Sequence, residues 1–409
     1  MSDPNVGTVR GIKLLEGGEH VLNNVFSPYA DYFIDMIEQH HSYISTEPVG
    51  IYESQTKHYV CQDYFNVEQQ NLWKKIPQFI APVQSLEKIG DFITVDYQGR
   101  VPMIVSKTDD NRCAVFENVC PHRGARLEHH QEGCKKAFVC PYHSWSFSHQ
   151  GNLIAARWKE AFPEIPDQYR SLNSIEAQQK FSMLWQMPEE PISGFSLEHW
   201  FAAIEDQMTA IGFEQHQLLN CRERMVRANW KLLIENFIEY YHVQSLHRNS
   251  LAPTLNGQLY SLDSFAQHGR ILTPLKNLAQ VRRQTPHKTR REMVATYLLF
   301  PNVIIGVQPY HVFVSFYQPV SVNQTWSKTF NFIHKADAMV REVCELDVEY
   351  LAEALEEDYE AIEQVQRNLE VSNAPSLLYG EAESLIGQLH RNLAAILRQS
   401  GSSREANRV

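Results

Sequence analysis

The sequence predicts an α+β protein in which a small antiparallel β domain is set into a larger region of mixed sheet and helices. Residues 77–170 show short alternating strands separated by turns, as in a compact β domain. Residues 171–409 instead mix sheet-like runs with long amphipathic helical patterns. We therefore divide the chain into an N-terminal segment, 1–76, the β domain, 77–170, and a larger α+β domain, 171–409.

Three runs of alternating apolar residues predict strands in the β domain. Phe92–Tyr97 and Val101–Ser106 flank a turn at Gln98–Arg100, and Cys113–Val119 follows a turn at Asp109–Asn111. Outside this domain the patterns predict helices and sheet. The expected helices are Asp31–His41, Val67–Lys75, Trp230–His247, Val340–Leu369 and Leu385–Leu397, and the expected sheet regions are Met293–Gln318 and Thr325–Ile333.

Composition limits the class of protein. The chain has 409 residues with a formal net charge of −11, which argues against nucleic-acid binding because phosphate contacts need clustered positive charge. The apolar run Tyr297–Val320 is interrupted by proline and polar residues, so we expect no membrane span. Met1–Gly18 shows no secretory signal, and a cytoplasmic location is expected. Seven cysteines, an odd number, favour free thiols and metal ligands over a disulfide framework.

Two cysteine–histidine loops form the first candidate site. Cys120 and His122 give C-x-H, and after seventeen intervening residues Cys140 and His143 give C-x-x-H. Two thiolates for one iron and two imidazoles for the other make the ligand set of a Rieske [2Fe–2S] cluster. A single zinc ion would accept the same residue types, so a structural Cys₂His₂ zinc site in a binding module is the alternative.

The second candidate site lies in the predicted helix Trp230–His247. Glu235, Glu239 and His242 are spaced four and three apart, which predicts that one helix face carries them. His247 follows His242 by five residues, roughly 140° around an ideal helix. Both histidines reach one metal ion only if the helix distorts or ends between them.

A carboxylate from elsewhere would complete the set of two histidines and one carboxylate that non-heme Fe(II) oxygenases use. Asp358 lies beside the apolar stripe of the predicted helix Val340–Leu369, where a carboxylate can face inward. We expect its neighbours Glu356, Glu357 and Glu360 to lie on a solvated face.

At this point the chain resembles the α subunits of Rieske non-heme iron oxygenases that hydroxylate aromatic rings or demethylate their substrates. The resemblance spans nearly the whole chain. It rests on Gly90-Asp91-Phe92, the loops Asn118–Ala125 and Cys140–Trp145, the block Asn229–His247, and Glu357-Asp358 with Gln366 after them.

The resemblance implies that Cys120, His122, Cys140 and His143 hold the cluster, and that His242, His247 and Asp358 hold mononuclear Fe(II). It also implies a helix-grip-like catalytic domain around the Rieske domain. Asn236 and Glu239 are the candidate catalytic residues.

The family commonly forms head-to-tail homotrimers, in which a carboxylate bridges the iron histidine to a cluster histidine of the next subunit. Glu239 matches that carboxylate and is expected to link His242 to His143 of a neighbouring subunit. Most relatives have aspartate there, and glutamate is found in the branch that oxidises quaternary ammonium compounds.

The expected function is hydroxylation, dihydroxylation or oxidative demethylation of a small organic substrate with O₂. Electrons would come from NAD(P)H through a separate reductase or ferredoxin, because the chain has no Rossmann glycine fingerprint. A Rieske electron carrier without its own chemistry is the alternative, but it would leave most of residues 171–409 unexplained.

A quaternary ammonium substrate would require an aromatic cage. Tyr240, Tyr241, Phe300, Tyr310 and Phe316 are candidates for it, although we expect them to be core residues. We expect the same of His311.

Overall fold

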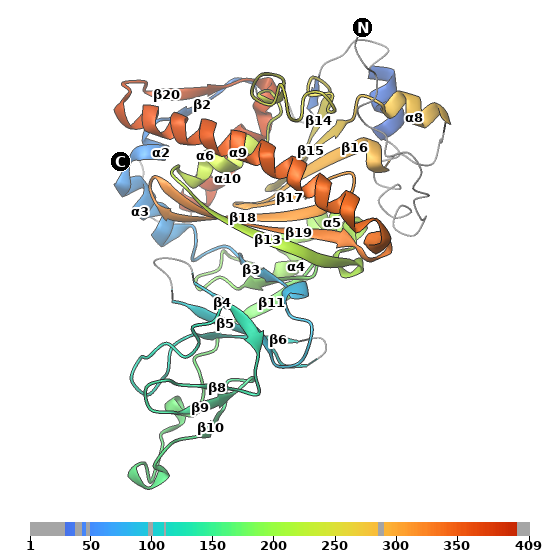
Figure 1. Cartoon of the computed structure of the whole chain (residues 1–409). Helices are drawn as coiled ribbons and strands as arrows, with labels where there is room; N and C mark the ends of the chain where they lie inside the picture. The colour runs from blue at the N-terminus through green and yellow to red at the C-terminus, as the bar shows by residue number, and fades with distance from the viewer. Residues whose placement is uncertain are drawn as a thin grey trace.

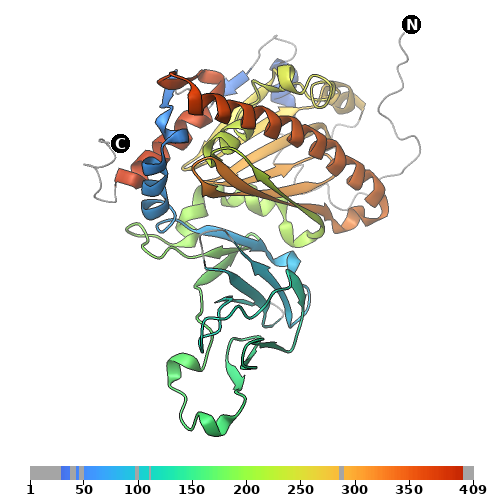
Figure 2. The same cartoon turned by 60° about the vertical axis from the view of Figure 1, so that its left-hand side comes forward.

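The computed structural model describes residues 29–36, 43–45, 50–96, 101–109, 112–284 and 290–398. These residues form a large sheet covered by helices, and a smaller group of β-sheets projects away from it (Figures 1 and 2). The mixed helix and antiparallel-sheet fold class is confirmed.

The large sheet has eight strands in the order β1-β14-β15-β16-β17-β18-β19-β13. All neighbours are antiparallel except the β1–β14 pair. Its strands are β1 Tyr43–Ser45, β13 His216–Val226, β14 Tyr260–Phe265, β15 His268–Pro274, β16 Met293–Leu299, β17 Val303–Val307, β18 Val312–Ser321 and β19 Gln324–His334. Every residue of β15, β16 and β17 is buried, because helices and the neighbouring segments cover the centre of the sheet.

The long helix α9 (Arg341–Val371) crosses the sheet, and α10 (Ser384–Arg398) follows it (Figure 1). In α9 the buried residues Val348, Asp358 and Ile362 recur at helical spacing, so one face of this helix packs inward. The other helices are α2 Lys57–Val60, α3 Gln62–Asn71, α4 Leu197–Phe201, α5 Glu205–Ile211, α6 Trp230–Phe237, α7 Val243–Leu246 and α8 Leu278–Gln284. The two-stranded sheet of β2 (Tyr52–Gln55) and β20 (Ser376–Tyr379) lies beside α10.

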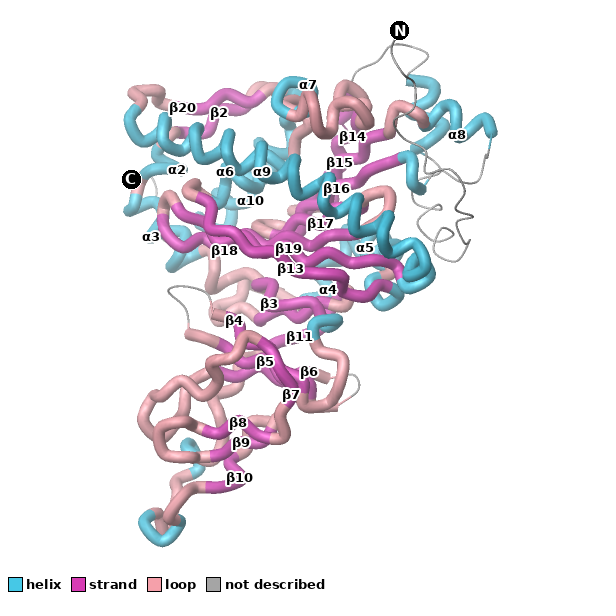
Figure 3. Tube along the Cα trace, in the orientation of Figure 1, coloured by secondary structure: helices cyan, strands magenta, loops and turns pink. Residues whose placement is uncertain are grey.

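The β domain has two small sheets, β6-β5-β4-β7 and β10-β9-β8, and in a third, β11-β12-β3, its strand β3 pairs with a strand that follows residue 170. Their strands are β3 Gln78–Pro82, β4 Asp91–Val95, β5 Met103–Lys107, β6 Cys113–Glu117, β7 Glu132–Cys134, β8 Ala137–Val139, β9 Ser146–Ser148, β10 Leu153–Ala155, β11 Ala177–Lys180 and β12 Met183–Gln186. A separate hydrophobic core, which includes Phe92, Phe116, Phe138, Trp145 and Phe147, lies between the first two sheets. Figure 3 shows β8–β10 at the end of the molecule opposite α6 and α7.

Most of the predicted elements are present with shifted ends. The sheet regions and the last two helices are confirmed, and residues 29–36 are helical, although residues 37–41 of that prediction lie outside the described residues. The helix predicted at Val67–Lys75 is α3, which begins earlier and ends at Asn71. The turn at Gln98–Arg100 and most of Asp109–Asn111 also lie outside the described residues. Among the described residues, no helix has the length and apolar character that a membrane crossing requires.

The predicted continuous helix Trp230–His247 is wrong. Helix α6 ends at Phe237, an irregular stretch follows, and α7 adds a single turn between His242 and His247. The stretch after α6 is held by the side chain of Glu239, which accepts hydrogen bonds from the backbone N–H groups of Tyr241 and His242. A carboxylate that binds backbone donors in this way competes with the helical pattern.

Candidate metal centres

The two cysteine–histidine loops have the same backbone fold. In each loop the N–H of the fourth residue after the cysteine donates to the cysteine carbonyl, from Gly124 to Cys120 at 2.8 Å and from Ser144 to Cys140 at 2.9 Å. Both donor residues have a left-handed backbone conformation, with φ of +75° at Gly124 and +58° at Ser144. Glycine adopts this conformation freely, whereas a serine there costs roughly 1–2 kcal/mol. The strain at Ser144 indicates that the second loop is held in shape for its side chains.

The four candidate cluster ligands lie in these two loops, and the cysteine and histidine of one loop each lie near their counterpart in the other. Cys120 and Cys140 are each 1% exposed, and the rings of His122 and His143 lie 4.8 Å apart. The Nδ1 atoms of both histidines are buried and, in the described part of the chain, have no hydrogen-bond partner. A buried polar atom without a partner is costly, so these atoms fit metal ligands better than core side chains.

The electrostatics of Cys120 also fit a metal site. Burial raises the pKa of this thiol, and the nearby Cys140 raises it further. Hydrogen bonds from the backbone N–H groups of His122 and Arg123 offset part of this rise, which leaves the pKa at about 11. A bound metal ion overcomes this preference for the protonated thiol, because a coordinating thiol loses its proton. The residues present therefore fit a cluster with two thiolate and two imidazole ligands.

Aromatic rings fix the plane of His122. The indole of Trp145 stacks parallel to it at 4.7 Å, and Phe162 meets it edge-on at 5.6 Å. Trp145 is only 2% exposed, so the stack is anchored in the domain core. The imidazole is thereby held in one orientation before any metal binds.

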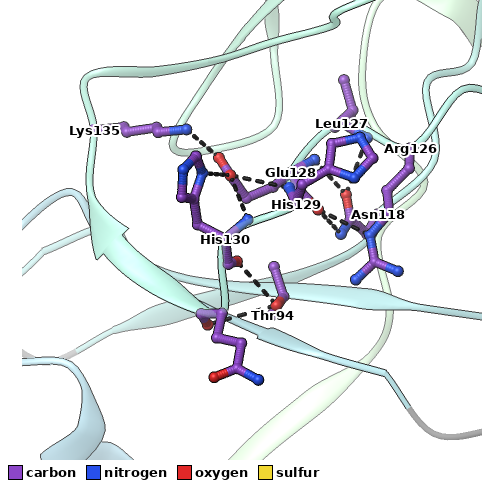
Figure 4. A network of polar contacts seen from close by, with 9 residues as sticks. Thr94, Asn118, Arg126, Leu127, Glu128, His129, His130 and Lys135 are labelled. Carbon is purple, nitrogen blue, oxygen red and sulfur yellow. Dashed lines mark hydrogen bonds and ion pairs between the residues drawn. The ribbon is translucent and has the colours of Figure 1, made fainter.

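A buried polar network holds the chain that leaves the first loop (Figure 4). The side-chain oxygen of Asn118 accepts hydrogen bonds from the backbone of Leu127 and Glu128, and its amide donates to the Glu128 carbonyl. The Glu128 carboxylate in turn binds Lys135 and His130. Burial alone would raise the pKa of Glu128, but these contacts lower it to about 2. The network joins both ends of the first loop to the turn between β7 and β8.

His242, His247 and Asp358 meet in the other candidate site. One ligand atom from each lies within 4.8 Å of the others. The Nε2 atoms of His242 and His247 are 3.6 Å and 2.9 Å from Oδ1 of Asp358. Asp358 is 5% exposed, so its expected inward orientation agrees with the structure. The end of α6 and the single turn of α7 allow both histidines to face the same point, as the sequence argument required.

Carboxylates hold the far sides of both imidazoles. Glu239 binds Nδ1 of His242, and Glu357 binds Nδ1 of His247 at 2.7 Å. Hydrogen bonds at Nδ1 direct Nε2 toward the metal position and fix the tautomer. Glu357 was expected on a solvated face, and that prediction is only partly right, because its side chain is 38% exposed but its carboxylate binds His247. It accepts a second hydrogen bond from Ser250 at 2.6 Å, which helical periodicity could not reveal.

The site concentrates negative charge. Burial would lower the pKa of His242, but Glu239 and then Asp358 raise it to about 9. The pKa of His247 is raised as well, since Asp358 and Glu357 outweigh its burial. A pair of imidazoles among carboxylates attracts positive charge, and a divalent metal ion would supply that charge.

Glu235 does not share a face with Glu239 and His242, contrary to the prediction, because α6 ends before them. Its carboxylate lies in a separate buried network, where it accepts hydrogen bonds from Tyr59 at 2.9 Å and Tyr379 at 2.7 Å and contacts His390 at 2.8 Å. This network joins α6 to the N-terminal and C-terminal parts of the chain.

A cavity of about 50 Å³ adjoins the three candidate ligands. Its other lining residues are largely apolar: Asn236, Phe237, Tyr240, Val243, Leu251, Leu255, Val294, Thr296, Gln308, Phe313, Leu351, Ala354 and Leu355. Asn236 therefore lies at the cavity.

Phe313 forms part of the cavity wall because of its cross-strand partner Gly306. A Cβ on Gly306 would meet the Phe313 ring at 1.9 Å. Glycine at this position lets the ring lie against the sheet.

Of the five aromatic residues considered for a cage, only Tyr240 lines this cavity. Phe300 and Phe316 are core residues as expected, whereas Tyr241 is 72% exposed. His311 is 2% exposed and its Nδ1 lies 2.7 Å from Asp347, which agrees with a core histidine.

Comparison with known families connects these two sites. Residues 77–166 match the model of the Rieske [2Fe-2S] domain. Residues 201–399 match that of the ring hydroxylating alpha subunit (catalytic domain). The chain therefore combines a Rieske [2Fe-2S] domain with a ring-hydroxylating alpha-subunit catalytic domain. The match to the Rieske model favours a [2Fe–2S] cluster over a zinc ion, and the catalytic-domain match accounts for a region that an electron carrier would not need.

Curated relatives include carnitine monooxygenase oxygenase subunit from Escherichia coli (strain K12), 27% identical over 198 residues, which are 46% of this chain and 50% of the relative. Methanesulfonate monooxygenase hydroxylase subunit alpha from Methylosulfonomonas methylovora is 28% identical over 52% of this chain and 54% of its own length. The chain thus spans about half the length of the curated relatives it matches.

Solved structures share the fold over more of the chain. A quaternary ammonium Rieske monooxygenase in complex with L-carnitine aligns with a TM-score of 0.72 at 19% identity, covering 86% of this chain and 97% of that one. Naphthalene 1,2-dioxygenase from Rhodococcus sp. aligns with a TM-score of 0.68 at 15% identity, covering 93% and 100%. At these identities the likeness shows the common fold.

Proposed function

We propose that this α subunit is the terminal oxygenase of a multicomponent enzyme that hydroxylates, dihydroxylates or oxidatively demethylates a small organic molecule. It would use O₂ and electrons from a separate NAD(P)H-dependent reductase or ferredoxin. The observation that carries the proposal is the presence of two distinct donor sets in one chain. One set suits a [2Fe–2S] cluster, and the other suits Fe(II) with open coordination positions.

In this proposal Cys120 and Cys140 hold one cluster iron, and His122 and His143 hold the other through their unpartnered Nδ1 atoms. The cluster supplies single electrons. The protein contributes buried thiols and an imidazole that the Trp145 stack has already oriented.

His242, His247 and Asp358 would hold the mononuclear iron, which supplies O₂ activation. Glu239 and Glu357 orient the two imidazoles through Nδ1. The apolar cavity beside the ligands would exclude bulk water from the substrate, and the Asn236 amide offers a polar contact there.

We propose that the working form is a homotrimer in which electrons pass between subunits. In a single chain, the strands β8 and β9 that flank the second cluster loop lie far from α6 and α7 (Figure 3). Tyr142 beside the cluster histidine is 57% exposed and Val139 is 51% exposed, as expected for a surface that a neighbour covers. Glu239 would then link His242 to His143 of the adjacent subunit.

The proposed domain division assigns 77–170 to the Rieske domain and 171–409 to the catalytic domain, with 1–76 packed on the latter. Buried contacts support the last point. Lys231 of α6 forms an ion pair with Glu68 of α3 at 2.8 Å, and Tyr59 binds Glu235. A cytoplasmic location stays a prediction.

Among substrates, we propose a small quaternary ammonium compound as the class to test first. Relatives whose names specify carnitine and glycine betaine monooxygenases favour it, and the family resemblance links Glu239 to that branch. Phe237, Tyr240 and Phe313 present aromatic rings to the cavity, which a cation can approach.

The test is a product screen with purified protein, a matching reductase, NADH and O₂. The panel comprises carnitine, glycine betaine, methanesulfonate and simple aromatic acids, with ¹⁸O₂ as the oxygen source. Label in an organic product supports the proposal. Cluster reduction without any oxygenated product, in protein that holds about three irons per chain, would refute the oxygenase assignment.

A further inference from the structure

A second and larger cavity lies beneath helix α9. This α9 groove has a volume of about 520 Å³ and opens between the helix and strands β13 and β19. Its lining residues are Arg222, Glu223, Arg224, Ser327, Thr329, Asn331, Val348, Glu349, Leu351, Ala352, Glu353, Leu355, Glu356 and Tyr359. A helix lying on a sheet ordinarily packs to the density of an organic crystal. The open space beneath α9 therefore needs an explanation.

The floor of the α9 groove is polar where apolar side chains would be expected. Ser327, Thr329 and Asn331 alternate along β19, so they project from the same face of the sheet. All three are nearly buried, at 2%, 5% and 3% exposed. Each has a hydrogen-bond partner: Ser327 with Tyr359 at 3.0 Å, Thr329 with Ser315 at 2.7 Å, and Asn331 with Asn220 at 2.7 Å. The groove thus persists without unpaired polar groups.

The α9 groove and the cavity at the candidate iron ligands share a wall. Leu351 and Leu355 of α9 line both spaces. On the sheet, Phe313 of the inner cavity is the direct cross-strand partner of Asn331 in the groove. Cross-strand partners place their side chains on the same face, so the two spaces lie side by side under one helix.

We propose that the α9 groove is the route by which substrate reaches the iron site, with Leu351 and Leu355 as the movable partition. The inference rests on the proposed function for what lies behind the partition. Ligand pockets are commonly about 300–1,000 Å³, whereas the inner cavity measures about 50 Å³. Substrate can enter only if part of the wall moves, and these leucines are incompletely buried. The hydroxyl and amide floor suits a small polar molecule rather than a bare hydrocarbon.

The probe for this route is 2,2′-bipyridine, a small chelator that turns red when it binds Fe(II). Reduced protein with a known mononuclear iron content is mixed with it anaerobically, and complex formation is followed over time. The visible spectrum of the cluster is recorded in parallel. Leu351→Ala and Leu355→Ala should speed removal of the mononuclear iron about tenfold, and Leu355→Trp should slow it by a similar factor.

Leu369→Ala is the matched control. Leu369 is a buried leucine of the same helix at 7% exposure, and it lines neither space. Its rate should equal that of the unchanged protein, which separates opening of the partition from general loosening of α9. Unchanged rates in the alanine variants, or equal acceleration in Leu369→Ala, would overturn the route. The chelator measurement needs no turnover. A protein that holds the iron but lacks oxygenase activity would therefore refute the proposed function, and the rates of iron removal would still test the route.

Discussion

Removing the carboxylate of Glu357 should weaken iron binding without disturbing the cluster. Glu357 accepts hydrogen bonds from His247 Nδ1 at 2.7 Å and from Ser250 at 2.6 Å. Partners of this kind are worth about 10–100-fold in metal affinity. The Glu357 side chain is 38% exposed, so water will replace part of the lost contact. We therefore expect Glu357→Gln to weaken Fe(II) binding about tenfold, equivalent to about 1.4 kcal/mol.

The measurement is an anaerobic Fe(II) titration of protein freed of mononuclear iron, with the cluster spectrum as an internal check. Glu360→Gln provides the control, because Glu360 is an exposed carboxylate of the same helix. It should bind iron as the unchanged protein does. Equal affinities for Glu357→Gln and Glu360→Gln would refute the orienting role, as would loss of the cluster in the Glu357 variant alone.

Four further predictions follow from the geometry. Cys140→Ala should abolish the visible spectrum of the cluster, and a retained spectrum would contradict the ligand assignment. Glu239→Gln should keep both metals and a reducible cluster but lose most product in a single-turnover assay, whereas near-normal product would argue against bridging. Glu68→Ala should cost about 3–5 kcal/mol in urea unfolding, because it leaves Lys231 charged and unpaired in the core; a loss below 1 kcal/mol would contradict this. The folded pKa of Glu128 is about 2, below its ordinary value of 4.5, so its contribution to stability should be complete above pH 4.5 and lost as the pH falls through 2. Glu128→Gln should flatten the acid limb of the unfolding curve.

The candidate cluster ligands could be named from sequence because their chemistry is local. Cys120 and His122 stand in one tight loop, as do Cys140 and His143, so spacing alone limits what they can bind. The same holds for the amphipathic pattern that predicted α9, since one face of a long helix must be apolar. Loop strain was not predictable in this way, because nothing in the sequence shows that Ser144 is left-handed.

Only the tertiary structure shows that the candidate iron ligands, which come from separate elements, lie close together. Asp358 comes from a helix remote in sequence from His242, and its carboxylate reaches the histidines only after α9 has packed across the sheet. Helical periodicity predicted that Glu357 faces solvent, but a residue at the edge of a buried stripe can face either solvent or a neighbouring segment. Its direction is set by Ser250 and His247, which lie in another segment. The sequence thus determined the donors that act within one loop, and packing determined those that must meet from separate elements, because such contacts depend on the path of the whole chain.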